Sequence, residues 1–153
     1  MTSLSSDWIE LLRGLNAASA KYLVVGAHAL GTYTTPRSTG DLDIWIDRSR
    51  GNAEIVYRVL AEFGAPLENV SIDDLQSDDL IFSFGSPPLR IDILTDISGV
   101  HFDEAWKART PGFLGDEPVN YISRELLIVN KRAAGRMKDL ADIESLESSI
   151  EPR

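Results

Sequence analysis

Residues 41–47 read Asp-Leu-Asp-Ile-Trp-Ile-Asp, which is the most informative pattern in the sequence. Alternate side chains of a β-strand share one face of the sheet. Asp41 and Asp43 therefore point the same way, while Leu42 and Ile44 point to the opposite face and build a core. A pair of carboxylates stands where a buried strand would ordinarily carry apolar residues.

A second acidic position lies in residues 91–93, which read Ile-Asp-Ile. Carboxylates held close together in a sheet repel one another and lose hydration, a cost that a divalent cation offsets. Carboxylate oxygens are the ligands that Mg²⁺ prefers. Asp41, Asp43 and Asp92 therefore predict a Mg²⁺ site, with Mn²⁺ as the alternative ion. The competing interpretation is that Asp41 caps a loop and Asp43 faces water on a half-exposed sheet.

The remaining pattern predicts an α/β (α+β) fold, a mixed β-sheet flanked by helices and followed by C-terminal helices. Helices are expected at 7–18, 27–32, 54–63, 123–134 and 137–148, and strands at 22–26, 41–47, 81–84 and 89–94. Residues 103–108 predict a helical turn, residues 110–118 an irregular Pro- and Gly-rich segment, and residues 119–122 a short edge strand. We expect one domain over 1–153, with its core at about 20–100 and a C-terminal helical segment at about 123–150.

The amino-acid composition indicates which classes of binding partner to expect. The chain of 153 residues has 24 acidic and 15 basic side chains, a formal net charge of −9, which disfavours a non-specific grip on a polyanion. A local basic patch lies within residues 124–138 and leaves RNA or nucleotide binding open. The sequence has no cysteine, no apolar run of membrane-spanning length and no signal-like start, so we expect a cytoplasmic protein without a membrane partner.

Residues before the first aspartate suit a phosphate ligand. Gly26 ends a strand and opens a helix, where backbone amides can receive a phosphate. Arg37, Ser38 and Thr39 lie just before Asp41 and offer donors for phosphate oxygens. These parts together predict the handling of a triphosphate with Mg²⁺.

Three blocks resemble the nucleotidyltransferase superfamily with the DNA polymerase β fold. They are Gly26-Ala27, then residues 41–44 after thirteen intervening positions, and finally residues 91–93. Residues 37–43, RSTGDLD, are similar to the version in the AbiEii-like abortive-infection nucleotidyltransferases and their small relatives. Residues 126–142, LLIVNKRAAGRMKDLAD, are similar to the helical segment of that family.

The resemblance implies roles for individual residues. Asp41, Asp43 and Asp92 would be the catalytic residues and metal ligands, with Asp92 helping to deprotonate the attacking hydroxyl. The NTP would be bound by Gly26, Ala27, Arg37, Thr39, Lys131 and Arg136. The chain departs from the family at Ala27, where Gly or Ser is usual, so this position offers a backbone amide and no hydroxyl.

The function implied is a Mg²⁺-dependent nucleotidyltransferase that moves an NMP from an NTP to a hydroxyl of RNA, tRNA, a protein or a small molecule. A toxin–antitoxin role with a cognate antitoxin is implied by family alone. The alternatives are a catalytically degenerate module that binds nucleotide or RNA, which Ala27 favours, and an interaction partner in a toxin system. For Lys131 and Arg136, a solvated face paired with the acidic residues from Asp139 onward is as well supported as a role in binding.

Overall fold

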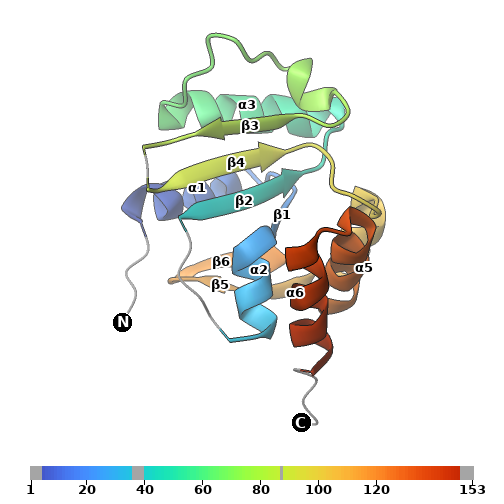
Figure 1. Cartoon of the computed structure of the whole chain (residues 1–153). Coiled ribbons are helices and arrows are strands. Elements are labelled where there is room, and N and C mark those ends of the chain that lie inside the picture. Colours follow the sequence, from blue (N-terminus) through green and yellow to red (C-terminus); the bar gives the residue numbers. More distant parts are fainter. Residues whose placement is uncertain (1–4, 36–39, 87, 149–153) are drawn as a thin grey trace.

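Six strands form one mixed sheet in the order β3-β4-β2-β1-β6-β5. Figure 1 shows this sheet in the computed structural model, which describes residues 5–35, 40–86 and 88–148. Strands β2 and β4 run parallel, whereas β1 is antiparallel to β2 and parallel to β6. The strands are β1 (Tyr22–Val25), β2 (Asp41–Ile46), β3 (Ile81–Phe84), β4 (Arg90–Leu94), β5 (Thr110–Leu114) and β6 (Glu117–Tyr121).

Helices cover both sides of the sheet, which confirms the predicted fold class. Figure 1 shows α2 and α6 in front of the sheet and α1 and α3 behind it. The helices are α1 (Ser6–Ala17), α2 (Gly26–Tyr33), α3 (Arg50–Phe63), the 3-10 turn η1 (Asp74–Gln76), α4 (Phe102–Lys107), α5 (Arg124–Ala134) and α6 (Met137–Ser148). None of these helices has the length and apolar character that crossing a bilayer requires.

Strand β2 alternates as its sequence predicts over its first half. Leu42 and Ile44 are buried, while Asp41 is exposed and Asp43 is half-buried. Trp45, on the face of the aspartates, is also buried, because it packs edge-on against Phe102 of α4 at 5.1 Å between ring centroids. The face of β2 that carries the aspartates is therefore open to ligands only near the start of the strand.

The expectation of an irregular segment over 110–118 is wrong. Thr110–Leu114 and Glu117–Tyr121 form a β-hairpin that extends the sheet beyond residue 100. The edge strand is β5, so the strand expected at 119–122 lies inside the sheet, between β1 and β5. An edge position tolerates Pro111. A side chain at Gly112 would come within 2.9 Å of the Tyr121 ring, which explains a glycine in this strand.

Asn52 of α3 fixes the ends of β1 and β2 relative to each other. Its Oδ1 accepts a hydrogen bond from the Lys21 amide at 2.7 Å. Its Nδ2 donates to the carbonyls of Lys21 at 3.0 Å and of Asp47 at 2.6 Å. The Asn52 side chain is buried, so these three bonds satisfy its polar atoms.

Replacing Asn52 with Ala should therefore lower the free energy of unfolding by about 1 to 3 kcal/mol, because buried polar groups lose their partners. Chemical denaturation measures the change. Glu62→Ala, at an exposed position of the same helix, is the control and should stay within about 0.5 kcal/mol of the unchanged chain. Equal stability of the Asn52 variant and this control would contradict the role of Asn52.

Candidate active site

Asp43 and Asp92 lie side by side on the parallel strands β2 and β4. The register pairs them directly, so both side chains leave the sheet on the same face. Burial, followed by hydrogen bonding to Asp92 and the negative charges of Asp92 and Asp41, raises the pKa of Asp43 to about 7. Ionising both carboxylates therefore costs free energy, because they lie close together and are partly shielded from water.

Asp41 lies on the same face but nearer the rim. Its side chain is 51% exposed, against 15% for that of Asp92. Arg90 stands opposite Asp41 in the register and connects the two aspartates. Its Nε is 3.9 Å from Oδ1 of Asp41, and its Nη2 donates to Oδ1 of Asp92 at 3.2 Å.

The donor set fits a divalent ion that is shared with a phosphate ligand. Within the described part of the chain, no three His, Cys, Asp or Glu side chains are arranged to hold a metal by themselves. Mg²⁺ is commonly held by one or two carboxylates and completed by substrate phosphates and water. The Asp43–Asp92 pair is the set of carboxylates that could hold such an ion, with Asp41 adjacent. The three-aspartate metal site stays a prediction.

Gly26 brings the start of α2 against Asp43. Val25 pairs with Asp43 in the register, so Gly26 is the next residue along. Its φ of +69° is in the left-handed region, and a Cβ at this position would overlap Oδ2 of Asp43. The first amides of a helix have no partner within the helix. The opening amides of α2, including that of Ala27, are thus beside the carboxylate pair and suit an anionic ligand.

Lys131 and Arg136 are held by acidic residues of α6. Nζ of Lys131 is 3.1 Å from Oδ2 of Asp142 and 3.6 Å from Oδ1 of Asp139. Nε of Arg136 donates to Oδ2 of Asp139 at 2.6 Å. Asp139 is fully buried, and its hydrogen bonds with Arg136 lower its pKa. Both cations are thus paired with acidic residues of α6, but the expectation of a solvated face is wrong for Lys131, whose side chain is buried.

Lys131 still acts on the candidate site through space. It is almost fully buried on α5, which packs against α2 together with α6. Its positive charge lowers the pKa of Asp43, against the larger upward effects of burial and of the other aspartates. A contact between Lys131 and phosphates stays a prediction.

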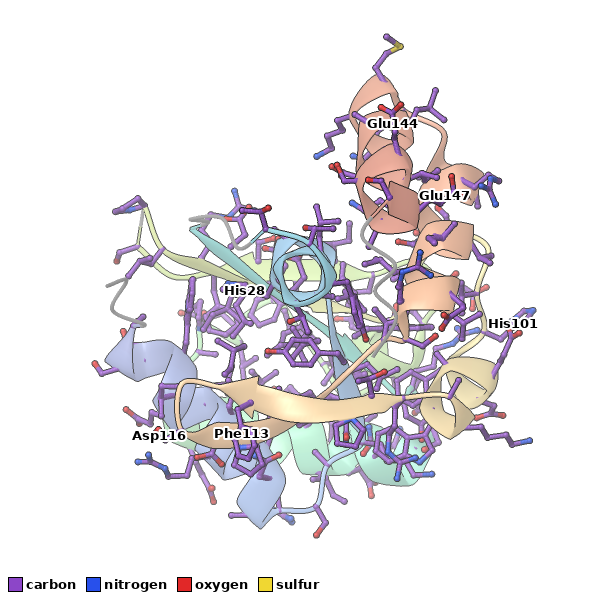
Figure 2. The ribbon with its side chains drawn as sticks, turned by 90° about the horizontal axis from the view of Figure 1, so that it is seen from below. His28, His101, Phe113, Asp116, Glu144 and Glu147 are labelled. Carbon is purple, nitrogen blue, oxygen red and sulfur yellow. The ribbon has the colours of Figure 1, made fainter. Side chains whose placement is uncertain are left out.

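Two expected nucleotide-binding residues, Arg37 and Thr39, lie outside the described residues. His28, one residue after Ala27, packs edge-on against Trp8 of α1 at 5.1 Å. Burial lowers the pKa of His28, and its Nε2 has no hydrogen-bond partner among the described residues. Figure 2 labels His28, which belongs to α2, the helix seen end-on in this view. Its role here is packing.

The sequence patterns did not single out Arg90 or Ser83. Ser83 pairs with Asp92 in the β3–β4 register, and its Oγ accepts from Nη2 of Arg90 at 3.4 Å. The signal for Arg90 was available, because it stands two positions before Asp92 in a strand and thus shares its face. Ser83 could be placed only once the pairing of β3 with β4 was known.

Comparisons with known proteins identify the fold. No family model matches the sequence, and no curated protein matches it. Among solved structures, the lincosamide antibiotic adenylyltransferase LnuA with lincomycin bound is similar, with 15% identity over 98% of this chain and 100% of that chain, at a TM-score of 0.55. A protein of Thermotoga maritima assigned as a nucleotidyltransferase has 16% identity over 92% of this chain and 88% of its own, at a TM-score of 0.59. The chain therefore has the nucleotidyltransferase fold.

Gly26→Ala tests the close approach of α2 to Asp43. The added Cβ meets a carboxylate oxygen at a positive φ, so we expect a loss of about 2 to 4 kcal/mol in the free energy of unfolding. Gly51→Ala is the matched control in α3, where a Cβ meets nothing within 4 Å. It should change stability by less than about 1 kcal/mol, in the stabilising direction. Equal stability of the two variants would show that the approach is not needed.

The raised pKa of Asp43 predicts a pH dependence of stability without metal. The folded value of about 7 exceeds the ordinary 3.8, so the folded chain keeps a proton that the unfolded chain has released. This contribution is complete in acid, below the ordinary pKa, and is lost as pH rises through the folded pKa. Asp43→Asn is neutral at every pH and should not lose it.

Denaturation with a chelator at pH about 5 and about 8 measures the effect. The unchanged chain should lose about 1 to 3 kcal/mol more than Asp43→Asn between the two pH values. Parallel losses in the two proteins would mean that Asp43 is ionised in the folded chain throughout this range.

Proposed function

We propose that this chain, with its nucleotidyltransferase fold, transfers a nucleoside monophosphate from an NTP to a hydroxyl of an acceptor with the help of Mg²⁺. The single observation that carries the proposal is the half-buried pair of Asp43 and Asp92 beside the opening amides of α2. A carboxylate pair and a helix N-terminus at one place suit a metal–triphosphate ligand.

Each residue has a definite part in the proposed reaction. Asp43 and Asp92 orient the metal–nucleotide, with Asp41 supporting them from the rim, and the amides of Gly26 and Ala27 receive phosphate oxygens. The acceptor oxygen forms a bond to the α-phosphorus, while the bond from that phosphorus to pyrophosphate breaks. Asp92 takes the hydroxyl proton. When bound, Mg²⁺ supplies charge neutralisation for the phosphates and stabilises the leaving pyrophosphate.

Electrostatics explains why a cation is part of the proposal. The chain carries a net charge of −9, and the site face has three aspartates. A triphosphate would be repelled by this field unless positive charge arrived with it. Lys131 acts on Asp43 only through space, since its ammonium is paired with Asp139 and Asp142.

The acceptor is better sought among small molecules and proteins than among RNAs. The basic stretch 124–138 is largely paired within the chain. Arg124 donates to the carbonyl of Leu146 at 2.6 Å, and Arg132 pairs with Glu147 at 3.3 Å. Figure 2 labels Glu147 and Glu144 on the projecting α6. The net charge of −9 also works against binding to a polyanion, which depends on many Lys and Arg contacts. The similarity to LnuA, a lincosamide adenylyltransferase, makes hydroxylated antibiotics one class to test.

The second candidate function is a module that binds a nucleotide without turnover. Ala27 favours it, because the family that the chain resembles usually has Gly or Ser at this position and Ala offers no hydroxyl to a phosphate. The toxin–antitoxin role remains an expectation from resemblance. Induced expression in cells tests it, and growth inhibition that persists in Asp43→Ala would separate toxicity from the proposed chemistry.

Label transfer tests the proposed activity. The chain is incubated with each α-labelled NTP, Mg²⁺, and in turn total RNA, total protein and a panel of hydroxylated antibiotics. We expect transfer to one acceptor class, lowered about a hundredfold or more by Asp43→Ala and by Asp92→Ala. Asp116→Ala, an exposed position on the β5–β6 hairpin in Figure 2, is the control and should keep full activity.

Transfer that is unchanged in Asp43→Ala would contradict the proposed site. No transfer from any NTP to any acceptor, together with calorimetric binding of Mg²⁺–NTP that needs Asp43, would favour the binding module instead.

A further inference from the structure

Arg90 places a positive charge among the carboxylates of the candidate site. We propose that Arg90 is an internal counter-ion that competes with the metal, so that the chain binds a free divalent ion weakly and takes it up together with the nucleotide. This inference rests on the proposed function, because it concerns the same carboxylates.

The strand register explains why Arg90 sits there. Strands β2 and β4 are parallel, with Asp41 opposite Arg90 and Asp43 opposite Asp92. Arg90 and Asp92 are two residues apart in β4 and therefore share a face. The guanidinium thus lies over the edge of the site and reaches both Asp41 and Asp92.

Several contacts hold this arrangement. Nη2 of Arg90 is 3.2 Å from Oδ1 of Asp92 and 3.4 Å from Oγ of Ser83. The Arg90 amide donates to the carbonyl of Gly40 at 2.6 Å, which fixes the start of β4 against the start of β2. The backbone is thereby held in place, while the side chain is 47% exposed and can leave.

The ion pairs of Arg90 are weak enough for a divalent cation to displace the guanidinium. Arg90 is 47% exposed and its partner Asp92 is 15% exposed, so the pair is only partly shielded. Ion pairs that water reaches contribute little to stability, because water screens them and the side chains lose freedom. A divalent ion that also gains triphosphate oxygens can therefore displace the guanidinium, whereas a free ion gains only the two or three carboxylates. Metal uptake then depends on the nucleotide more strongly than in a site without Arg90.

Titration calorimetry with Mn²⁺ alone, and with Mn²⁺ plus a non-hydrolysable ATP analogue, tests the inference on the full chain. Arg90→Gln should bind Mn²⁺ alone about three- to thirtyfold more tightly than the unchanged chain, the effect of losing one or two exposed ion pairs. The increase in Mn²⁺ affinity that the analogue produces should be smaller in Arg90→Gln by a similar factor.

Arg48→Gln is the matched control. It removes the same charge from another partly exposed arginine, one that pairs with Asp78 beyond the end of β2. It should leave Mn²⁺ affinity within about twofold of the unchanged chain, since exposed charges at a distance are screened. Adding Asp43→Asn to Arg90→Gln should abolish the binding, which locates the ion at the carboxylate pair.

The Nε–Hε signal of Arg90 in a ¹⁵N NMR spectrum gives a second readout on the unchanged chain. Addition of Mg²⁺ with the analogue should shift this signal, because the guanidinium leaves Asp92. A signal that stays in place, or Mn²⁺ affinity that is equal or weaker in Arg90→Gln, would overturn the inference. If Arg90→Gln fails to fold, the NMR measurement decides alone.

These outcomes are distinct from failure of the proposed function. Mn²⁺ binding that needs Asp43 but ignores Arg90 would remove the inference and leave the metal site intact. The absence of Asp43-dependent Mn²⁺ binding, with or without the analogue, would remove both.

Discussion

Electrostatic repulsion between Asp43 and Asp92 is the constraint on which the rest of the candidate site depends. Parallel pairing of β2 with β4 puts the two carboxylates next to each other, and burial removes the water that would screen them. A fold that needed only stability would place apolar side chains at such positions. The two carboxylates instead lie beside the start of α2, on the part of the sheet face that Trp45 and Phe102 do not cover.

The positive charges near Asp43 and Asp92 lie at the edge of the candidate site. Arg90 reaches Asp41 and Asp92 from the rim, and Lys131 is held by α6 and acts on Asp43 through space. Gly26 leaves room for the Asp43 carboxylate while it opens α2 beside it. The centre is therefore negative and the amides next to it are free of helical partners, an arrangement that a cation bound to an anionic ligand complements.

The sequence predicted local features well and spatial partners poorly. The Asp-Leu-Asp-Ile alternation and Gly26 at the start of a helix depend on neighbouring residues, and the structure has both. The hairpin of β5 and β6 was missed, because Pro111 and Gly112 are tolerated in β5 only as an edge strand, and the edge is defined by the whole fold. The contact of Arg90 with Asp41 was missed because these residues are far apart in the chain and meet only through the β2–β4 register.

The central claim is that Asp43 and Asp92 together bind a metal–nucleotide at the start of α2. A crystal structure with Mn²⁺ and a non-hydrolysable NTP analogue, with anomalous data for manganese, tests it most directly. We expect an anomalous peak coordinated by both carboxylates, with the triphosphate at the amides of Gly26 and Ala27. A peak elsewhere, or a nucleotide that binds away from α2, would contradict it.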